Sequence, residues 1–133
     1  EKKDHNQLTR EESQEQRKLS QFALIIAKDR YVGLINNFGK TIAGQLRPGL
    51  LPLLSVEQAI NEHFIDATRN QLRKAFDSTL GATLYTLTLN IKVITLTFPS
   101  QSGGSYYITV DREIGSEELF KLIDLLVEKI SAI

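Results

Sequence analysis

The sequence predicts an α+β fold, a five-stranded antiparallel sheet with helices on both faces, in the order α-β-β-α-β-β-β-α. The first observation behind this prediction is a long amphipathic helical stretch at residues 55–80. The second is a pair of strand-like runs before it, and the third is a set of three such runs after it. Strands linked by hairpins around one crossover helix form an α+β layer structure. We place the central helix on one face of the sheet and the two terminal helices on the other.

Composition limits the classes of protein to consider. Sixteen basic and sixteen acidic residues cancel, whereas a nucleic-acid-binding domain usually carries a basic excess, so we expect no nucleic-acid partner. The chain has no cysteine, which excludes disulfides and thiol chemistry and fits a cytoplasmic compartment. No apolar run approaches the roughly 18 residues that a membrane span needs, so we expect no membrane partner.

The length of 133 residues suits one domain. Residues 1–9 are almost wholly polar and are predicted to be an N-terminal extension, and residues 10–133 are predicted to form a single domain. Because the chain begins at Glu1 and contains no methionine, we expect a processed or trimmed form.

The first helix is predicted at residues 10–28, because Thr9 and Glu12 form a capping-box pattern. Its apolar stripe begins only at Leu19. The first turns therefore form either a solvated helical extension or an arm that docks on a partner.

A hairpin is predicted next, with strands at residues 31–35 and 40–46. Gly39 lies in the turn between them, where positive φ is useful. Gly33 and Gly44 lie within the strands, which indicates a close backbone approach or a bulge.

The connector at residues 47–54 contains two prolines and four leucines. The prolines and a glycine prevent regular structure, and the leucines must cover something. They form either a lid on the core or a docking surface for another subunit.

The central helix is predicted to begin after Ser55, which forms a second capping-box pattern with Gln58. At 1.5 Å per residue it would be roughly 38 Å long, enough to span the sheet. Gly81 follows its last apolar residue, where a residue of positive φ ends many helices. Its apolar stripe is formed by Val56, Ala59, Ile60, Phe64, Ala67, Leu72, Phe76 and Leu80.

Three strands follow, at residues 82–89, 91–98 and 106–110. The first two alternate leucine or isoleucine with threonine, which is typical of half-buried strands, and Asn90 between them predicts a tight hairpin. A flexible hairpin loop is expected at residues 99–105. The last strand would place Tyr106, Ile108 and Val110 on one face, and Ser116 would cap the final helix.

No motif in the chain indicates catalysis, so we predict no enzyme activity and no cofactor. His63 and Asp66 are spaced to share a metal ion, but two ligands do not hold zinc, so no metal site is predicted. Gly39, Lys40 and Thr41 imitate the end of a phosphate-binding loop. They lack the earlier glycine of that motif and precede a strand instead of a helix.

This element order resembles the roadblock/LC7 class of the profilin-like and longin-like group. At the level of sequence, the chain is also similar to a family of short, uncharacterised proteins from ammonia-oxidising archaea (Thaumarchaeota). The shared runs are N-x-x-G-K at Asn36 to Lys40, G-L-x-P-L at Gly49 to Leu53, R-K-x-F-D-x-x-L-G at Arg73 to Gly81, and Y-T-L at Tyr85 to Leu87. That family carries no assigned activity.

The resemblance to roadblock proteins implies a non-catalytic interaction module that forms a homodimer and binds a small GTPase or a larger assembly. Residues 82–89 would be a sheet edge, and an unpaired apolar edge needs a cover. The residues expected in the dimer interface are Ala59, His63, Ala67, Asn70, Arg73, Leu84, Tyr85, Leu87 and Leu89. The residues of a candidate partner patch are Arg69, Arg73, Lys74, Leu50 and Leu51, although the basic residues also fit a solvated face.

The alternative function is a small-ligand sensor of the profilin-like or PAS-like type. Its pocket would lie between sheet and helix, with polar tips from Tyr31, Tyr85, Tyr106 and Tyr107. A cavity of several hundred cubic ångströms lined by these residues would favour this alternative.

Overall fold

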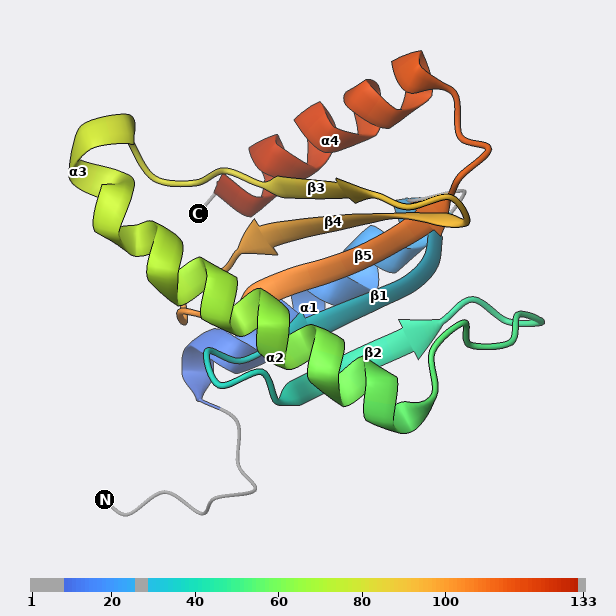
Figure 1. Cartoon of the computed structure of the whole chain (residues 1–133), viewed down its shortest axis with the longest axis horizontal. Helices are drawn as coiled ribbons and strands as arrows, with labels where there is room; N and C mark the ends of the chain where they lie inside the picture. Colours follow the sequence, from blue (N-terminus) through green and yellow to red (C-terminus); the bar gives the residue numbers. More distant parts are fainter. Residues whose placement is uncertain (1–8, 26–28, 132–133) are drawn as a thin grey trace.

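A computed structural model describes residues 9–25 and 29–131 and confirms the predicted order of elements (Figure 1). The remainder of the predicted extension and the predicted end of the first helix, at residues 26–28, lie outside the described residues. The helices are α1 (Arg10–Ile25), α2 (Val56–Arg73), α3 (Asp77–Leu80) and α4 (Ser116–Ser131), and a 3₁₀ turn, Lys74–Phe76, joins α2 to α3. The strands are β1 (Asp29–Ile35), β2 (Thr41–Leu46), β3 (Thr86–Leu89), β4 (Val93–Pro99) and β5 (Ser105–Asp111).

The strands form one antiparallel sheet in the order β2-β1-β5-β4-β3, so β2 and β3 are its edges. The predicted edge strand is therefore at an edge, but it is shorter than predicted, since only its last four residues pair with β4. The hairpin turn after it is also wider than predicted. The Asn90 N–H donates to the Val93 carbonyl at 2.9 Å, so residues 91 and 92 belong to the turn and not to a strand.

The hydrophobic core lies on the face of the sheet covered by α1 and α4 (Figure 1). Alternate residues of the three central strands point to this face, as the period-two pattern of a half-buried strand predicts. Helices α1 and α4 close it with apolar residues at helical spacing. The buried core residues are Leu19, Phe22, Val32, Leu34, Ile94, Leu96, Phe98, Tyr106, Ile108, Val110, Ile114, Leu119, Ile123 and Leu126.

Helix α1 is tied to the sheet by a buried carboxylate. Glu15 is 5% exposed and accepts hydrogen bonds from the Ser102 N–H at 3.0 Å and the Ser102 hydroxyl at 2.6 Å. The predicted flexible loop between β4 and β5 therefore has a fixed partner. The second turn of α1 packs on this loop through Glu15, whereas Arg10, Glu11 and Gln14 are exposed, so both alternatives for the first turns stay predictions.

Helix α2 crosses the opposite face of the sheet, as predicted (Figure 1). The Ser55 hydroxyl and the Gln58 side chain form the predicted capping box at its start. The prediction of one continuous helix to residue 80 was wrong, because a 3₁₀ turn interrupts it after Arg73. From residue 71 to residue 80 every side chain is exposed, so no packing against the sheet holds this end in regular α geometry. Gly81 then takes the predicted positive φ, +85°.

Candidate functional site

Most of the large apolar residues of α2, and of the turns that follow it, point away from the sheet. A surface helix usually turns its apolar stripe towards the core. Here the fully buried residues of α2 are His63, Asp66 and Ala67, two of which are polar. The large apolar residues are exposed on the outside of the helix and of the turns that follow it. We call this set the outer apolar surface: Ile60, Phe64, Ile65, Leu72, Phe76 and Leu80, each at least 48% exposed.

Edge strand β3 adds a second exposed apolar feature. Leu87 and Leu89 pair with Leu96 and Ile94 of β4, so they point to the core side of the sheet but lie beyond its cover. They are 36% and 56% exposed, and Leu84 just before the strand is 62% exposed. The other side of this strand has no partner strand in the described part of the chain.

The residues expected in a dimer interface divide into two groups. Arg73, Leu84, Leu87 and Leu89 are exposed. Tyr85 is half-buried and packs on Phe98, with ring centroids 6.0 Å apart.

The other four expected interface residues are turned towards the protein's own sheet, which corrects their predicted orientation. His63 and Ala67 are 5% and 4% exposed. Ala59 is half-buried, and Asn70 donates a hydrogen bond to the Ser105 hydroxyl at 2.9 Å. The sequence did carry a signal for this orientation. Polar residues recur at helical spacing along one side of α2, and threonines recur on every second residue of the strands beneath it.

The candidate partner patch is not one surface. Arg69, Arg73 and Lys74 are exposed near the end of α2, and the Arg73 guanidinium lies 4.9 Å from the centre of the Phe76 ring. Leu50 and Leu51 precede the start of α2, and the Leu51 carbonyl accepts a hydrogen bond from Arg30 at 3.5 Å. About 20 Å of helix separates the two groups.

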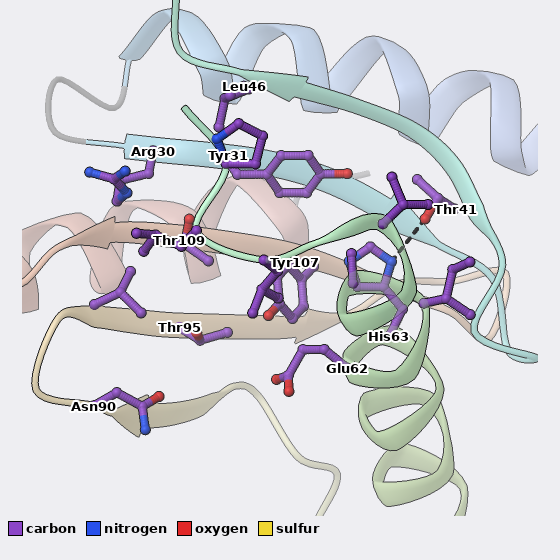
Figure 2. A pocket seen from close by; sticks show the side chains of 17 residues that line it. Arg30, Tyr31, Thr41, Leu46, Glu62, His63, Asn90, Thr95, Tyr107 and Thr109 are labelled. Carbon is purple, nitrogen blue, oxygen red and sulfur yellow. Dashed lines mark hydrogen bonds between the residues drawn. The ribbon is translucent and has the colours of Figure 1, made fainter. Parts of the chain in front are cut away.

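A cavity of about 410 Å³ lies between the first half of α2 and the sheet (Figure 2). It is open on one side, where the connector before α2 contributes Pro52, Leu53 and Leu54. This connector was predicted to be either a lid on the core or a docking surface. It forms a wall of the cavity, although its leucines are also open to solvent: Leu51, which does not line the cavity, is 83% exposed, and the lining residues Leu53 and Leu54 are 52% and 41% exposed.

The predicted close approach at Gly33 and Gly44 explains the floor of the cavity. The two glycines pair across β1 and β2, and the Tyr31 ring lies over both. A Cβ atom at Gly33 would stand 2.6 Å from the Tyr31 ring, and one at Gly44 would contact its hydroxyl. Because Gly33 and Gly44 have no side chains, the Tyr31 ring packs directly on the strand backbone. The space on the other face of the ring, towards α2, is therefore left open as the cavity.

Three rings meet at the inner end of the cavity. The His63 ring lies edge-on to Tyr107, with centroids 4.9 Å apart, and the Tyr31 ring is 6.3 Å from each of them. His63 Nδ1 and the Thr41 hydroxyl are hydrogen-bonded at 2.8 Å (Figure 2). Of the four tyrosines expected in a ligand pocket, Tyr31 and Tyr107 line the cavity. Tyr85 and Tyr106 do not, because they pack with the core on the opposite face.

Burial keeps these groups neutral near pH 7. It lowers the pKa of His63, and the nearby carboxylates of Asp66 and Glu62 oppose this shift without reversing it. Burial also raises the pKa of Tyr107 far above its usual range, and the Glu62 carboxylate adds to that rise. Burial raises the pKa of Tyr31 as well. The inner end of the cavity therefore consists of uncharged rings beside an acidic residue.

The described residues hold no group of three or more histidines and carboxylates that could bind a metal ion. No helix among them is long and apolar enough to span a membrane. What the site offers is therefore an exposed apolar surface, an open strand edge and an apolar cavity.

Comparison with known proteins identifies the fold. No protein-family model matches the chain, and neither does any curated protein sequence. Among solved structures, the gliding protein MglB from Thermus thermophilus aligns with a TM-score of 0.67 and 10% identity, covering 94% of this chain and 91% of its own. A roadblock/LC7 domain from Streptomyces avermitilis aligns with a TM-score of 0.59 and 12% identity, covering 84% and 90%. The chain has the roadblock/LC7 fold.

A third structure, MglB with a tetrameric arrangement, aligns with this roadblock/LC7 fold at a TM-score of 0.60 and 11% identity, covering 93% of each chain. These identities are too low to indicate more than a common fold. The predicted resemblance to the roadblock/LC7 class is thereby confirmed as a matter of fold.

Proposed function

We propose that the protein is a non-catalytic interaction module that forms a homodimer through edge strand β3 and the outer apolar surface of α2 and α3. The observation that carries this proposal is the reversed orientation of α2. Its polar residues face the sheet, and Leu72, Phe64 and Ile60 are 68%, 61% and 61% exposed.

Exposed apolar surface of this extent needs a cover in water. Burying it stabilises an assembly by roughly 25 cal/mol for each Å² removed from solvent. Contiguous apolar patches on soluble proteins usually mark sites of protein association. A second copy of the chain is the simplest cover, because it supplies the same apolar surface at equal concentration.

Edge strand β3 points to the same partner. Its free backbone groups can pair with those of another strand, and a two-fold axis beside it would join two five-stranded sheets into one. Among structures of similar fold, MglB occurs in a tetrameric arrangement, which supports assembly as a property of this architecture. The interface that we propose leaves out His63, Ala67, Ala59 and Asn70, because their own sheet already covers them.

A small GTPase, or a larger assembly that contains one, is the further partner that the roadblock resemblance implies. The exposed basic residues Arg69, Arg73 and Lys74 are available for an acidic surface of that partner. We propose the cytoplasm as the compartment in which both would meet.

Light scattering on the purified protein at micromolar concentration tests the homodimer. We expect the mass of two chains for the wild type. Leu72→Lys and Leu87→Lys should each yield monomer or insoluble protein. Phe120→Lys is the matched control, because Phe120 is 54% exposed on α4, which contributes no residue to the proposed interface, and it should remain dimeric. A monomeric wild type would contradict the proposal.

Affinity capture from native extract separately tests the GTPase. We expect a small GTPase to be recovered with the wild type and lost with Arg69→Glu combined with Arg73→Glu. Recovery of other proteins without a GTPase would refute this part alone and leave the homodimer standing.

A further inference from the structure

The cavity under α2 shares only Ile60 with the outer apolar surface, so the proposed homodimer does not account for it. Its volume of about 410 Å³ falls within the usual range for small-molecule sites. Protein interiors are normally close-packed, with few voids larger than one water molecule. An opening of this size beside a packed core therefore requires an explanation of its own.

The outer walls of the cavity are apolar. They come from the connector, from the first turns of α2 and from the ends of the strands. The apolar lining residues are Leu46, Pro52, Leu53, Leu54, Val56, Ala59, Ile60 and Val93, of which Ile60 also belongs to the outer apolar surface. A ligand in contact with them must have an apolar body.

The inner end is aromatic. Faces and edges of Tyr31, His63 and Tyr107 come together within 6.3 Å of one another. Aromatic faces attract cations, and groups of rings are the usual means of holding an alkylated ammonium ion. The neutral state of His63 is compatible with this role, since a protonated ring would repel a cation.

The charged residues around the cavity also favour a cationic ligand. Glu62 lies beside Tyr107 at the inner end, and Arg30 lies at the opposite end (Figure 2). Arg30 is already paired with Asp111 at 3.2 Å. Among the described residues, Glu62 forms no such ion pair. Asp66, one turn further along α2 and 3% exposed, adds a second carboxyl group behind the rings.

We propose that this cavity binds a small organic monocation with an apolar body, an alkylamine or a quaternary ammonium compound, with its charge against Glu62 and the three rings. Its apolar part lies along the connector leucines. An anion would meet the Glu62 carboxylate and no unpaired cation, because Arg30 is already paired with Asp111. A neutral apolar molecule would contact the apolar walls but would make no favourable electrostatic interaction with Glu62.

Titration calorimetry on the full chain tests this with three probes of similar length: hexyltrimethylammonium, hexanol and hexanoate. We expect saturable binding of the cation at one site per chain. Hexanol should bind at least about tenfold more weakly, the scale of a desolvated cation–aromatic contact, and hexanoate should not bind. Equal binding of hexanol, tighter binding of hexanoate, or no binding of the cation would each overturn the proposal.

The variant Glu62→Gln tests whether the cation binds in this cavity. We expect it to weaken binding of the cation by about tenfold, because it removes the charge and keeps the shape. Glu57→Gln is the matched control, since Glu57 is exposed one helical turn earlier and does not line the cavity, and its affinity should be unchanged. An unchanged affinity in Glu62→Gln would refute the assignment. Whichever of Leu72→Lys and Leu87→Lys is a soluble monomer should bind the cation as the wild type does, so failure of the homodimer and failure of the ligand site are distinguishable.

Discussion

The two faces of the sheet are built in opposite ways. Under α1 and α4, apolar residues of both helices meet apolar residues of three strands, and Leu96, Phe98 and Ile108 are completely buried. Under α2, the sheet presents threonines, tyrosines and glycines, and the side chains of the helix that face it are histidine, aspartate and asparagine. The apolar residues of α2 face outward, and a cavity remains below. The face under α1 and α4 thus stabilises the fold, and the side with α2 is available for the proposed partner chain and the proposed ligand.

Truncation of the core should produce the largest effect. Phe98→Ala removes a side chain that is completely buried and should lower the free energy of unfolding by about 3–5 kcal/mol. Phe64→Ala removes the same side chain from the outside of α2, where it is 61% exposed, and should cost less than about 1 kcal/mol. Urea denaturation in the background of a soluble monomeric variant, Leu72→Lys or Leu87→Lys, keeps dimerisation out of both values. Equal losses would remove the contrast between the faces.

A methyl group at Gly44 should produce an intermediate effect. Its Cβ atom would strike Tyr31, so the ring must move up into the cavity, at a cost of about 1–3 kcal/mol. Gly115→Ala is the control, because a Cβ atom there meets nothing within 4 Å. Combining Gly44→Ala with Tyr31→Leu should restore part of the loss in thermal unfolding. If Gly44→Ala alone changes nothing, the glycine floor does not shape the cavity.

The pH dependence of stability should produce the smallest effect. Burial lowers the pKa of His63 in the folded protein, so the unfolded chain binds this proton more readily. The stability from the neutral ring is complete above its ordinary pKa of about 6.5 and is lost as pH falls below it. Between pH 7 and pH 5.5 we expect a loss below about 1 kcal/mol that His63→Gln removes. If the free energy of unfolding depends on pH in the same way in wild type and in His63→Gln, burial does not lower the pKa of His63.

Local patterns predicted the elements well because their causes are local. Both capping boxes, at Thr9 with Glu12 and at Ser55 with Gln58, exist as predicted. The alternation in β5 correctly placed Tyr106, Ile108 and Val110 on one face of the sheet. These features depend on residues within four positions of each other, which the sequence displays directly.

The orientation of α2 could not be predicted in the same way. Periodicity shows that one side of a helix is apolar, but not what covers that side. The polar residues of α2 face the sheet because they bond to residues far away in the sequence: His63 to the Thr41 hydroxyl, and Asp66 to the Ser105 hydroxyl, which donates to it at 2.7 Å. The cavity depends on the meeting of Gly33 with Gly44 and on the fold of the connector. Neither can be deduced before the register of the strands is known.

Cysteine cross-linking along β3 tests the central claim, that this edge pairs with a second copy. The chain has no cysteine, so each variant carries a single thiol. In an antiparallel pair about a two-fold axis, residues at the axis stand opposite their own copies with Cβ atoms about 4.5–5.5 Å apart. Among Thr86→Cys, Leu87→Cys, Thr88→Cys and Leu89→Cys, we predict that at least one forms a disulfide-linked dimer rapidly under mild oxidation. Gln45→Cys on β2, the opposite edge, should remain monomeric on the same non-reducing gel. If no β3 variant cross-links, or if Gln45→Cys cross-links as readily, the proposed homodimer is contradicted.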